Sequence, residues 1–279
     1  LCKEFFAPRC DCAVVAIHKH NMTSLPDVLA SMHALRRVEV TDGTLKNLPD
    51  NFGSNAKNLA MVVLDFNELT ALPETFGRMS SLHTMYAAFN RLENVPKNFW
   101  KLQELYKVDF GTNRIGEAFE DAAINLPNLH FLTLANNSIS KFPPAWHEKN
   151  MGCPSLVILD VSGNDLRSLP RGIESLKYLE TIYFARNKVN SSSLPHAMAA
   201  TTLLRKIDAR NNSLTHMPYW FSNVHDLYMS GNPFCNQIPK PDICAEQCSA
   251  YCNSADLLNY GCDLSCNVLD CNYDNNQCK

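Results

Sequence analysis

Twelve cysteines are the residues of this 279-residue chain whose type and spacing most directly imply chemistry. Seven of them fall between Cys244 and Cys278, a density that would leave a row of reactive thiols in a reducing cytosol. Cysteines this closely spaced form disulfides in an oxidising compartment. The sequence therefore predicts a protein that is secreted or lies on the extracellular face of the plasma membrane.

The other reactive side chains form no recognisable catalytic motif. The chain has no His-Glu-x-x-His zinc motif, no Gly-x-Ser-x-Gly nucleophile elbow and no glycine-rich phosphate loop, and its histidines are scattered. Its Cys-x3-Cys pairs lack the closer Cys-x2-Cys spacing of zinc sites. We therefore expect neither an enzyme nor a zinc site.

The segment 248–279 carries six of the cysteines in a regular pattern. The spacing is Cys248-x3-Cys252-x9-Cys262-x3-Cys266-x4-Cys271-x6-Cys278. This spacing, together with Gly261-Cys262-Asp263 and Cys266-Asn267, resembles the Notch-type cysteine repeat. So short a segment cannot bury enough surface to fold unaided, so disulfides and a metal ion are the expected supports. Six cysteines permit fifteen pairings, and spacing alone does not choose among them.

The resemblance implies both a disulfide pairing and a metal. The implied pairs are Cys248 with Cys271, Cys252 with Cys266, and Cys262 with Cys278. It also implies one calcium ion bound by oxygen atoms of Asp263, Asn267 and Asp274, with backbone carbonyls near Asn259. Gln277 stands where the family pattern has an aspartate, which removes a ligand charge and should weaken binding. The alternative is a module held by disulfides alone.

Ten repeats, mostly 23 to 25 residues apart, precede this module. Each has apolar residues at repeat positions 0, 3 and 5, and most have asparagine at position 8. The eight clearest repeats begin at Leu59, Leu82, Leu105, Leu129, Leu156, Leu179, Leu204 and Val224, and two looser ones begin at Cys12 and Leu35. The pattern resembles the leucine-rich-repeat family and covers roughly residues 12–234.

The repeat pattern predicts an α/β repeat solenoid, a leucine-rich-repeat horseshoe with short parallel strands on its concave face. Apolar residues at positions 3 and 5 alternate as in a strand with one buried face. The asparagine at position 8 ends the strand and can satisfy backbone groups of the neighbouring turn. In Leu72-Pro73-Glu74-Thr75-Phe76, proline stops the chain from continuing as a strand and phenylalanine fills the convex side of the core.

A stack of repeats needs a cap at each end. We expect an N-terminal cap and irregular first repeat at 1–33, regular repeats at 34–234, a C-terminal cap at 235–247 and the cysteine module at 248–279. Cys2, Cys10 and Cys12 resemble an N-terminal cap that lacks its fourth cysteine, so a Cys2–Cys12 disulfide would leave Cys10 unpaired. Cys235 and Cys244 bracket a closing loop, and Cys153 has no evident partner.

Aromatic side chains gather on the predicted concave face, because alternate strand residues point away from the core. The candidate ligand-binding residues are Met61, Val63, Phe66, Tyr86, Phe89, Tyr106, Asp109, Phe131, Asp160, Tyr183 and Asp208. Exposed aromatics with a polar border are typical of a protein or peptide site. The alternative is that the phenylalanines at position 7 pack sideways as a stabilising ridge.

The net charge of the chain and its glycosylation motifs restrict the kinds of partner it could bind. The formal charge is −3 with mixed signs, so nothing suggests binding to nucleic acid, and no apolar run is long enough for a membrane span. Asn-x-Ser/Thr motifs occur at Asn21, Asn136, Asn190 and Asn211. Glycans at Asn136 and Asn211 would shield the later repeats and leave repeats two to five accessible.

The sequence favours a non-catalytic receptor ectodomain or secreted binder that recognises a protein, a peptide or a glycan. One alternative is a secreted inhibitor or decoy of a foreign extracellular enzyme. Another is a structural or adhesion protein, which would be expected to self-associate, with Cys153 as a candidate link.

Overall fold

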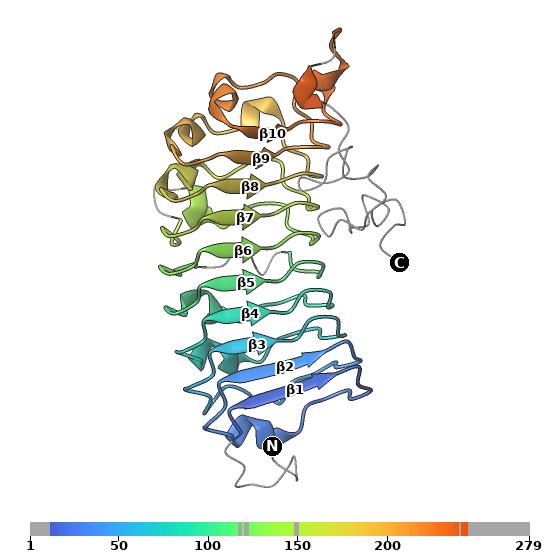
Figure 1. The fold of residues 1–279 in the computed structure, drawn as a ribbon, viewed down its shortest axis with the longest axis vertical. Helices are drawn as coiled ribbons and strands as arrows, with labels where there is room; N and C mark the ends of the chain where they lie inside the picture. The colour runs from blue at the N-terminus through green and yellow to red at the C-terminus, as the bar shows by residue number, and fades with distance from the viewer. Residues whose placement is uncertain (1–11, 117–118, 120–122, 148–150, 240, 245–279) are drawn as a thin grey trace.

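The computed structural model describes residues 12–116, 119, 123–147, 151–239 and 241–244. They form one open sheet of ten parallel strands that pair in chain order from β1 to β10 (Figure 1). The strands are β1 (Val14–His18), β2 (Arg37–Thr41), β3 (Met61–Val63), β4 (Thr84–Tyr86), β5 (Lys107–Asp109), β6 (Phe131–Thr133), β7 (Ile158–Asp160), β8 (Thr181–Tyr183), β9 (Lys206–Asp208) and β10 (Asp226–Tyr228). The expected repeat solenoid of short parallel strands is confirmed.

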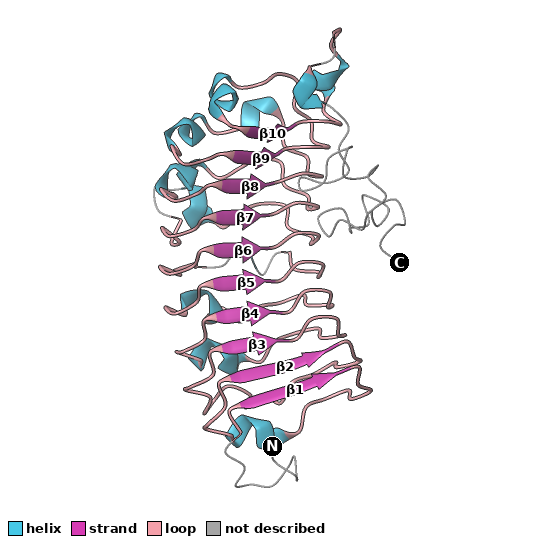
Figure 2. Ribbon diagram, in the orientation of Figure 1, coloured by secondary structure: helices cyan, strands magenta, loops and turns pink. Residues whose placement is uncertain are grey.

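Short 3-10 helices connect most of these strands in the described part of the chain. They are η1 (Asp27–Ser31), η2 (Glu74–Arg78), η3 (Phe99–Lys101), η4 (Pro144–His147), η5 (Arg171–Ser175), η6 (Ser191–Ser193), η7 (His196–Ala200) and η8 (Tyr219–Asn223). Two more, η9 (Pro233–Asn236) and η10 (Asp242–Cys244), follow β10. Figure 2 shows most of them on the side where the strands begin. A repeat of 23 to 25 residues leaves little room for more than one helical turn.

Proline sets where many of these turns start. The carbonyl of Pro73 accepts the N–H of Phe76 at 3.0 Å, and that of Pro96 accepts the N–H of Phe99 at 2.9 Å. Both phenylalanines are fully buried. The Pro-x-x-aromatic pattern is therefore a single tight turn that places a large ring in the core.

An asparagine ladder joins neighbouring repeats, as the sequence predicts. The Oδ1 atom of Asn187 accepts the N–H of Leu166 at 2.9 Å, and its Nδ2 donates to the carbonyls of Val161 and Phe184, each at 3.0 Å. The same arrangement recurs at Asn67, Asn90, Asn113, Asn137, Asn164, Asn212 and Asn232. Each ladder asparagine thus satisfies backbone groups of its own repeat and of the preceding one. Strand pairing does not reach these groups.

The residue just before the ladder position has a positive φ in every repeat, and we call this set the exit column. Its members are Lys19, Asp42, Phe66, Phe89, Thr112, Asn136, Gly163, Arg186, Asn211 and Gly231. Glycine, asparagine and aspartate tolerate this left-handed conformation best. A phenylalanine there is conformationally unfavourable, so its presence at two successive repeats needs another reason.

Disulfide-bonded cysteines lie at both ends of the described stack of repeats. Cys235 and Cys244 form a disulfide, and Cys12 is also disulfide-bonded. Cys2, Cys10 and the module at 248–279 lie outside the described residues. Cys153 is a free, fully buried thiol, which corrects its suggested role in covalent self-association because a buried sulfur cannot reach a second chain.

In the described part of the chain, no helix has both the length and the apolar character for crossing a bilayer.

Candidate binding surface on the strand face

The first and third residues of each short strand point away from the core and form a surface that we call the strand face. Parallel pairing aligns the third residues side by side, so that Tyr86 faces Asp109, and Asp160 faces Tyr183. Between them, the middle residues of the strands are buried. The strand face is therefore a continuous surface to which every repeat contributes in register.

Phe66 and Phe89 form a stacked pair at the exit edge of this face. Their ring centroids are 4.4 Å apart with an interplanar angle of 9°, and each residue remains 50% exposed. The sideways packing considered from sequence therefore occurs, but it leaves half of each residue in contact with water. An exposed, preformed aromatic pair is a feature that protein-binding sites use.

A second aromatic group lies at the opposite edge, where the strands begin. Tyr106 lies between His83 and His130, stacked on the first and tilted against the second, at centroid distances of 5.1 and 4.4 Å. Phe131 packs against Tyr106 at 5.4 Å. Sequence reasoning noted that the histidines are scattered and gave these two no role. Their 23- to 24-residue spacing from Tyr106 could have placed them beside it, because one repeat separates each neighbour from the next.

Lys107 occupies the middle of the strand face between two rings. Its Nζ atom lies 5.1 Å from the Tyr86 ring centroid and 5.6 Å from that of Phe131. Such a cation–π arrangement fixes a long flexible side chain across three strands. The sequence-predicted residues Tyr86 and Phe131 thus flank a lysine that the prediction omitted, and Tyr106 immediately precedes that lysine.

Three carboxylates, two on this face and Asp65 just beyond the end of β3, accept backbone N–H groups. Asp109 accepts from Gly111 at 2.8 Å, Asp160 from Ser162 at 2.9 Å, and Asp65 from Ala88 at 2.7 Å. The aspartates therefore accept hydrogen bonds from backbone N–H groups just after the chain leaves a strand. Sequence reasoning selected Asp109 and Asp160 but missed Asp65, whose acceptor role depends on the neighbouring repeat.

Burial shifts the pKa values of the same three carboxyl groups. Removal from water raises the pKa of Asp65 to about 6 and that of Asp160 to about 6, and it also raises the pKa of Asp109. The backbone hydrogen bonds oppose these shifts, and the nearby acids reinforce the shifts of Asp65 and Asp160. None of the three forms an ion pair with a described lysine, arginine or histidine.

Two predicted binding residues are not accessible. Tyr183 is 5% exposed, with the Lys206 ammonium 5.9 Å from its ring centroid, and Asp208 is 3% exposed. The Asp208 carboxylate receives hydrogen bonds from Nε and Nη2 of Arg210 at 2.8 and 2.6 Å. Long side chains on β9 and just after it cover this part of the face, so Tyr183 and Asp208 are corrected from ligand contacts to structural groups.

Met61, Val63, Tyr86, Tyr106, Asp109, Phe131 and Asp160 are all partly exposed. The candidate surface therefore runs from β3 to β7 and includes Phe66 and Phe89. No group of metal-binding side chains occurs among the described residues. The proposed calcium ligands Asn259, Asp263, Asn267, Asp274 and Gln277 lie outside the described residues, as do the cysteines of that module.

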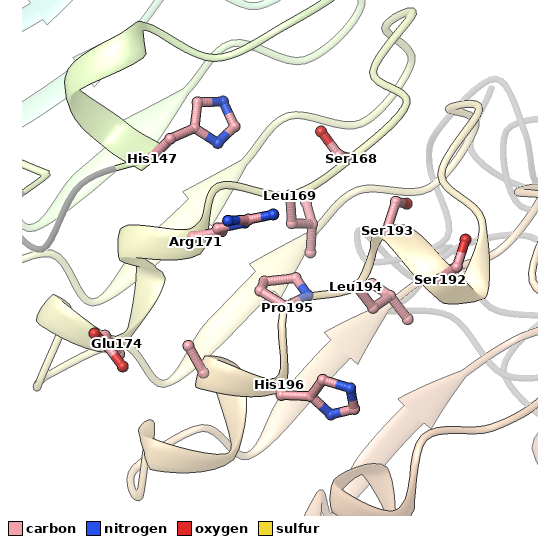
Figure 3. Close-up of a pocket in the computed structure, with 11 residues that line it drawn as sticks. His147, Ser168, Leu169, Arg171, Glu174, Ser192, Ser193, Leu194, Pro195 and His196 are labelled. Carbon is pink, nitrogen blue, oxygen red and sulfur yellow. The ribbon is translucent and has the colours of Figure 1, made fainter.

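A hollow of about 690 Å³ lies away from the strand face, among η4, η5, η6 and η7. Its polar lining includes His147, Arg171, Glu174, Ser192 and His196. In Figure 3, His147 and His196 lie at opposite ends of the hollow, with Arg171 and Pro195 between them. These groups do not converge on one point, so the hollow lacks the geometry of an active site.

Comparisons with known proteins agree with this architecture. Residues 127–171 match the family model of leucine-rich repeats in two copies. The chain is 28% identical over 141 residues to Toll-like receptor 4 of Pongo pygmaeus, covering 48% of this chain and 16% of the relative. It is 28% identical over 138 residues to lumican of Gallus gallus, covering 48% of this chain and 36% of lumican.

Solved structures show the same fold. A leucine-rich-repeat protein of Leptospira interrogans superposes with a TM-score of 0.68 at 24% identity, covering 78% of this chain and 55% of that chain. The chain therefore contains leucine-rich repeats arranged as a solenoid. The sequence matches span well under half of the two relatives' lengths, so they define the repeats and not the activity of a whole protein.

Proposed function

We propose that this chain is a non-catalytic extracellular recognition protein that binds a protein or peptide ligand on its strand face. The observation that carries the proposal is the exposed Phe66–Phe89 stack, beside three carboxylates that form no ion pair with a described residue. A folded protein gains little by leaving two phenylalanines half exposed in a strained backbone conformation. A ligand that covers them would recover their hydrophobic free energy.

The disulfide chemistry and the glycosylation motifs support an extracellular location. Cys235 and Cys244 are joined, and all four sequon asparagines are exposed at the surface. Glycans at Asn136 and Asn211 would extend from the exit column, the same edge that carries the phenylalanine pair. They would cover that edge beside the later repeats and leave Phe66 and Phe89 accessible.

The test uses a displayed library of random 16-residue peptides, selected against the immobilised full chain. Each selected peptide is then measured against Phe66→Ala/Phe89→Ala and against the control Tyr178→Ala/Tyr219→Ala. Both tyrosines are exposed, at 59% and 72%, and lie beside or within the 3-10 helices. Loss of central aromatic contacts typically costs more than about tenfold in affinity.

We expect most selected peptides to lose at least tenfold in affinity for the phenylalanine variant and to bind the tyrosine variant normally. Peptides that bind the phenylalanine variant normally but lose affinity for the tyrosine variant would place recognition on the helical side and overturn the proposal. Circular dichroism spectra and melting temperatures of both variants would verify that each remains folded.

A further inference from the structure

Several acidic side chains on and around the sheet have a basic partner. Arg210 pairs with Asp208, Arg37 with Glu39, Arg91 with Glu68, and Lys188 with Asp165. Asp65, Asp109 and Asp160 differ, because each accepts a backbone N–H but forms no ion pair with a described residue. Burying a carboxylate without a cation costs stability, and a neutral acceptor such as asparagine could fill the same backbone role. Their negative charge is therefore unexplained by folding.

Asp65 is the unpaired carboxylate nearest in sequence to the exposed aromatic pair. Its Oδ1 atom accepts the Ala88 N–H, and no described residue donates to Oδ2. Phe66 follows it directly, and Asp42 precedes Phe66 in the exit column. Asp42 and Glu39 are also close enough to Asp65 to raise its pKa. Asp65 and Asp42 thus adjoin Phe66, Asp65 as the preceding residue and Asp42 at the preceding position of the exit column.

The basic residues on this part of the face are already engaged. Arg37 is paired with Glu39, and Lys107 lies between the rings of Tyr86 and Phe131, where it also lowers the pKa of Asp109. From β2 to β7 the acids of the strand face and exit column, together with Asp65 between them, outnumber the bases Arg37 and Lys107; these acids are Glu39, Asp42, Asp65, Asp109 and Asp160. This half of the strand face is therefore complementary to a positively charged ligand.

We infer that the strand face from β2 to β5 binds a basic segment of a partner protein, with an arginine or lysine stacked on Phe66 and Phe89 and its charge at Asp65. This inference rests on the proposed function and specifies its ligand. A guanidinium group suits the site because it can stack on an aromatic face and donate to a carboxylate at the same time. The free Oδ2 atom of Asp65 supplies an acceptor.

The experiment uses four fluorescent peptide libraries that share random apolar flanking residues and differ in a fixed central residue, Arg, Lys, Gln or Glu. Binding to the full chain is measured by fluorescence anisotropy. The key variant is Asp65→Asn, which removes the charge but keeps an oxygen that can accept the Ala88 N–H. The matched control is Asp165→Asn, an exposed acid that pairs with Lys188 at a turn beyond the strand face.

We expect affinity to fall in the order Arg, Lys, Gln, Glu. The Asp65→Asn variant should weaken the Arg library by about three- to tenfold and leave the Gln library unchanged, while the control changes neither. In the wild-type chain, raising the salt concentration should weaken the Arg library more than the Gln library, a readout that needs no variant.

Equal binding of the Arg, Gln and Glu libraries, or an unchanged Arg affinity in Asp65→Asn, would overturn the basic ligand. If Phe66→Ala/Phe89→Ala still abolished binding in that case, the strand face would remain the recognition site. If the phenylalanine variant bound every library as the wild type does, both the inference and the proposed function would be wrong.

Discussion

The imidazole of His20 lies over Gly43, where a β-carbon would come within 2.2 Å of ring atom Cε1. In the later repeats a ladder asparagine of the next repeat accepts the equivalent backbone N–H, but Gly43 stands at that position and has no side chain. His20 supplies the missing acceptor, because its Nδ1 receives the Met22 N–H at 3.2 Å. The two residues together replace one asparagine of the ladder.

The Gly43→Ala variant is expected to lose about 1–3 kcal/mol of unfolding free energy, since the new methyl group would occupy the space of the His20 ring. The double variant His20→Ala/Gly43→Asn should recover part of that loss by restoring the asparagine. Urea denaturation of the wild type and both variants measures the effect. Gly111→Ala is the control, because its β-carbon would lie 3.1 Å from the nearest atom. Equal losses of unfolding free energy in Gly43→Ala and Gly111→Ala would contradict the close packing of His20 over Gly43.

Asp160 should make the protein less stable at neutral pH than at mildly acidic pH. Burial raises its pKa to about 6, so the folded state binds a proton more tightly than the unfolded state, and stability increases as the pH falls from about 6 towards 4. Asp160→Asn should therefore be more stable than the wild type at pH 7.5, by on the order of 1 kcal/mol.

Urea denaturation between pH 4.5 and 8 tests this expectation as a difference between the two proteins. The difference isolates Asp160, because His20 is present in both proteins. Burial lowers the pKa of His20, which gives stability the opposite pH dependence. Asp165→Asn serves as the exposed control. A constant difference across the pH range would show that the Asp160 carboxylate titrates normally.

Asn187 should be far more important to stability than an exposed asparagine. It is buried, and its amide bonds backbone groups of two repeats. Asn187→Ala would leave those groups unsatisfied, at a cost of about 2–4 kcal/mol. Asn128→Ala removes an exposed side chain whose Nδ2 donates to the Gln103 carbonyl at 2.9 Å, and should cost much less. Thermal unfolding of the two variants would reveal whether ladder position decides the loss.

Cys153 should be chemically silent in the folded protein. Burial raises its thiol pKa to about 12, and its Sγ contacts only the protein interior. A thiol reagent such as DTNB is expected to react with it only after unfolding by urea, and Cys153→Ser should leave the oligomeric state unchanged. Rapid labelling of Cys153 under native conditions, located by mass spectrometry, would refute this description.

Calcium should stabilise the C-terminal module if its resemblance to the Notch-type repeat extends to the metal site. We expect a low-temperature unfolding transition of the full chain that moves upwards with calcium and disappears from that position with chelator. Gln277→Asp should increase the calcium shift by restoring a ligand charge, and Asp263→Asn should abolish it. An identical melting curve with and without calcium in all three proteins would mean that disulfides alone support residues 248–279.

The sequence by itself determined the repeat architecture. Apolar residues recurring at strand spacing can be buried only if successive repeats stack, and the asparagine after each strand serves the same backbone groups every time. The ten strands and the asparagine ladder could therefore be predicted from spacing alone. The phenylalanine pair was also predictable, because Phe66 and Phe89 share one repeat position and must be neighbours.

Only the tertiary structure decided which face residues a ligand can reach. Tyr183 and Asp208 share a strand position with Tyr86 and Asp109, yet Lys206 and Arg210 cover the former pair and leave the latter partly exposed. The role of Asp65 likewise depends on Ala88, a residue of the next repeat. Burial and pKa depend on the length and direction of side chains from adjacent repeats, and repeat spacing places those side chains without fixing how they pack.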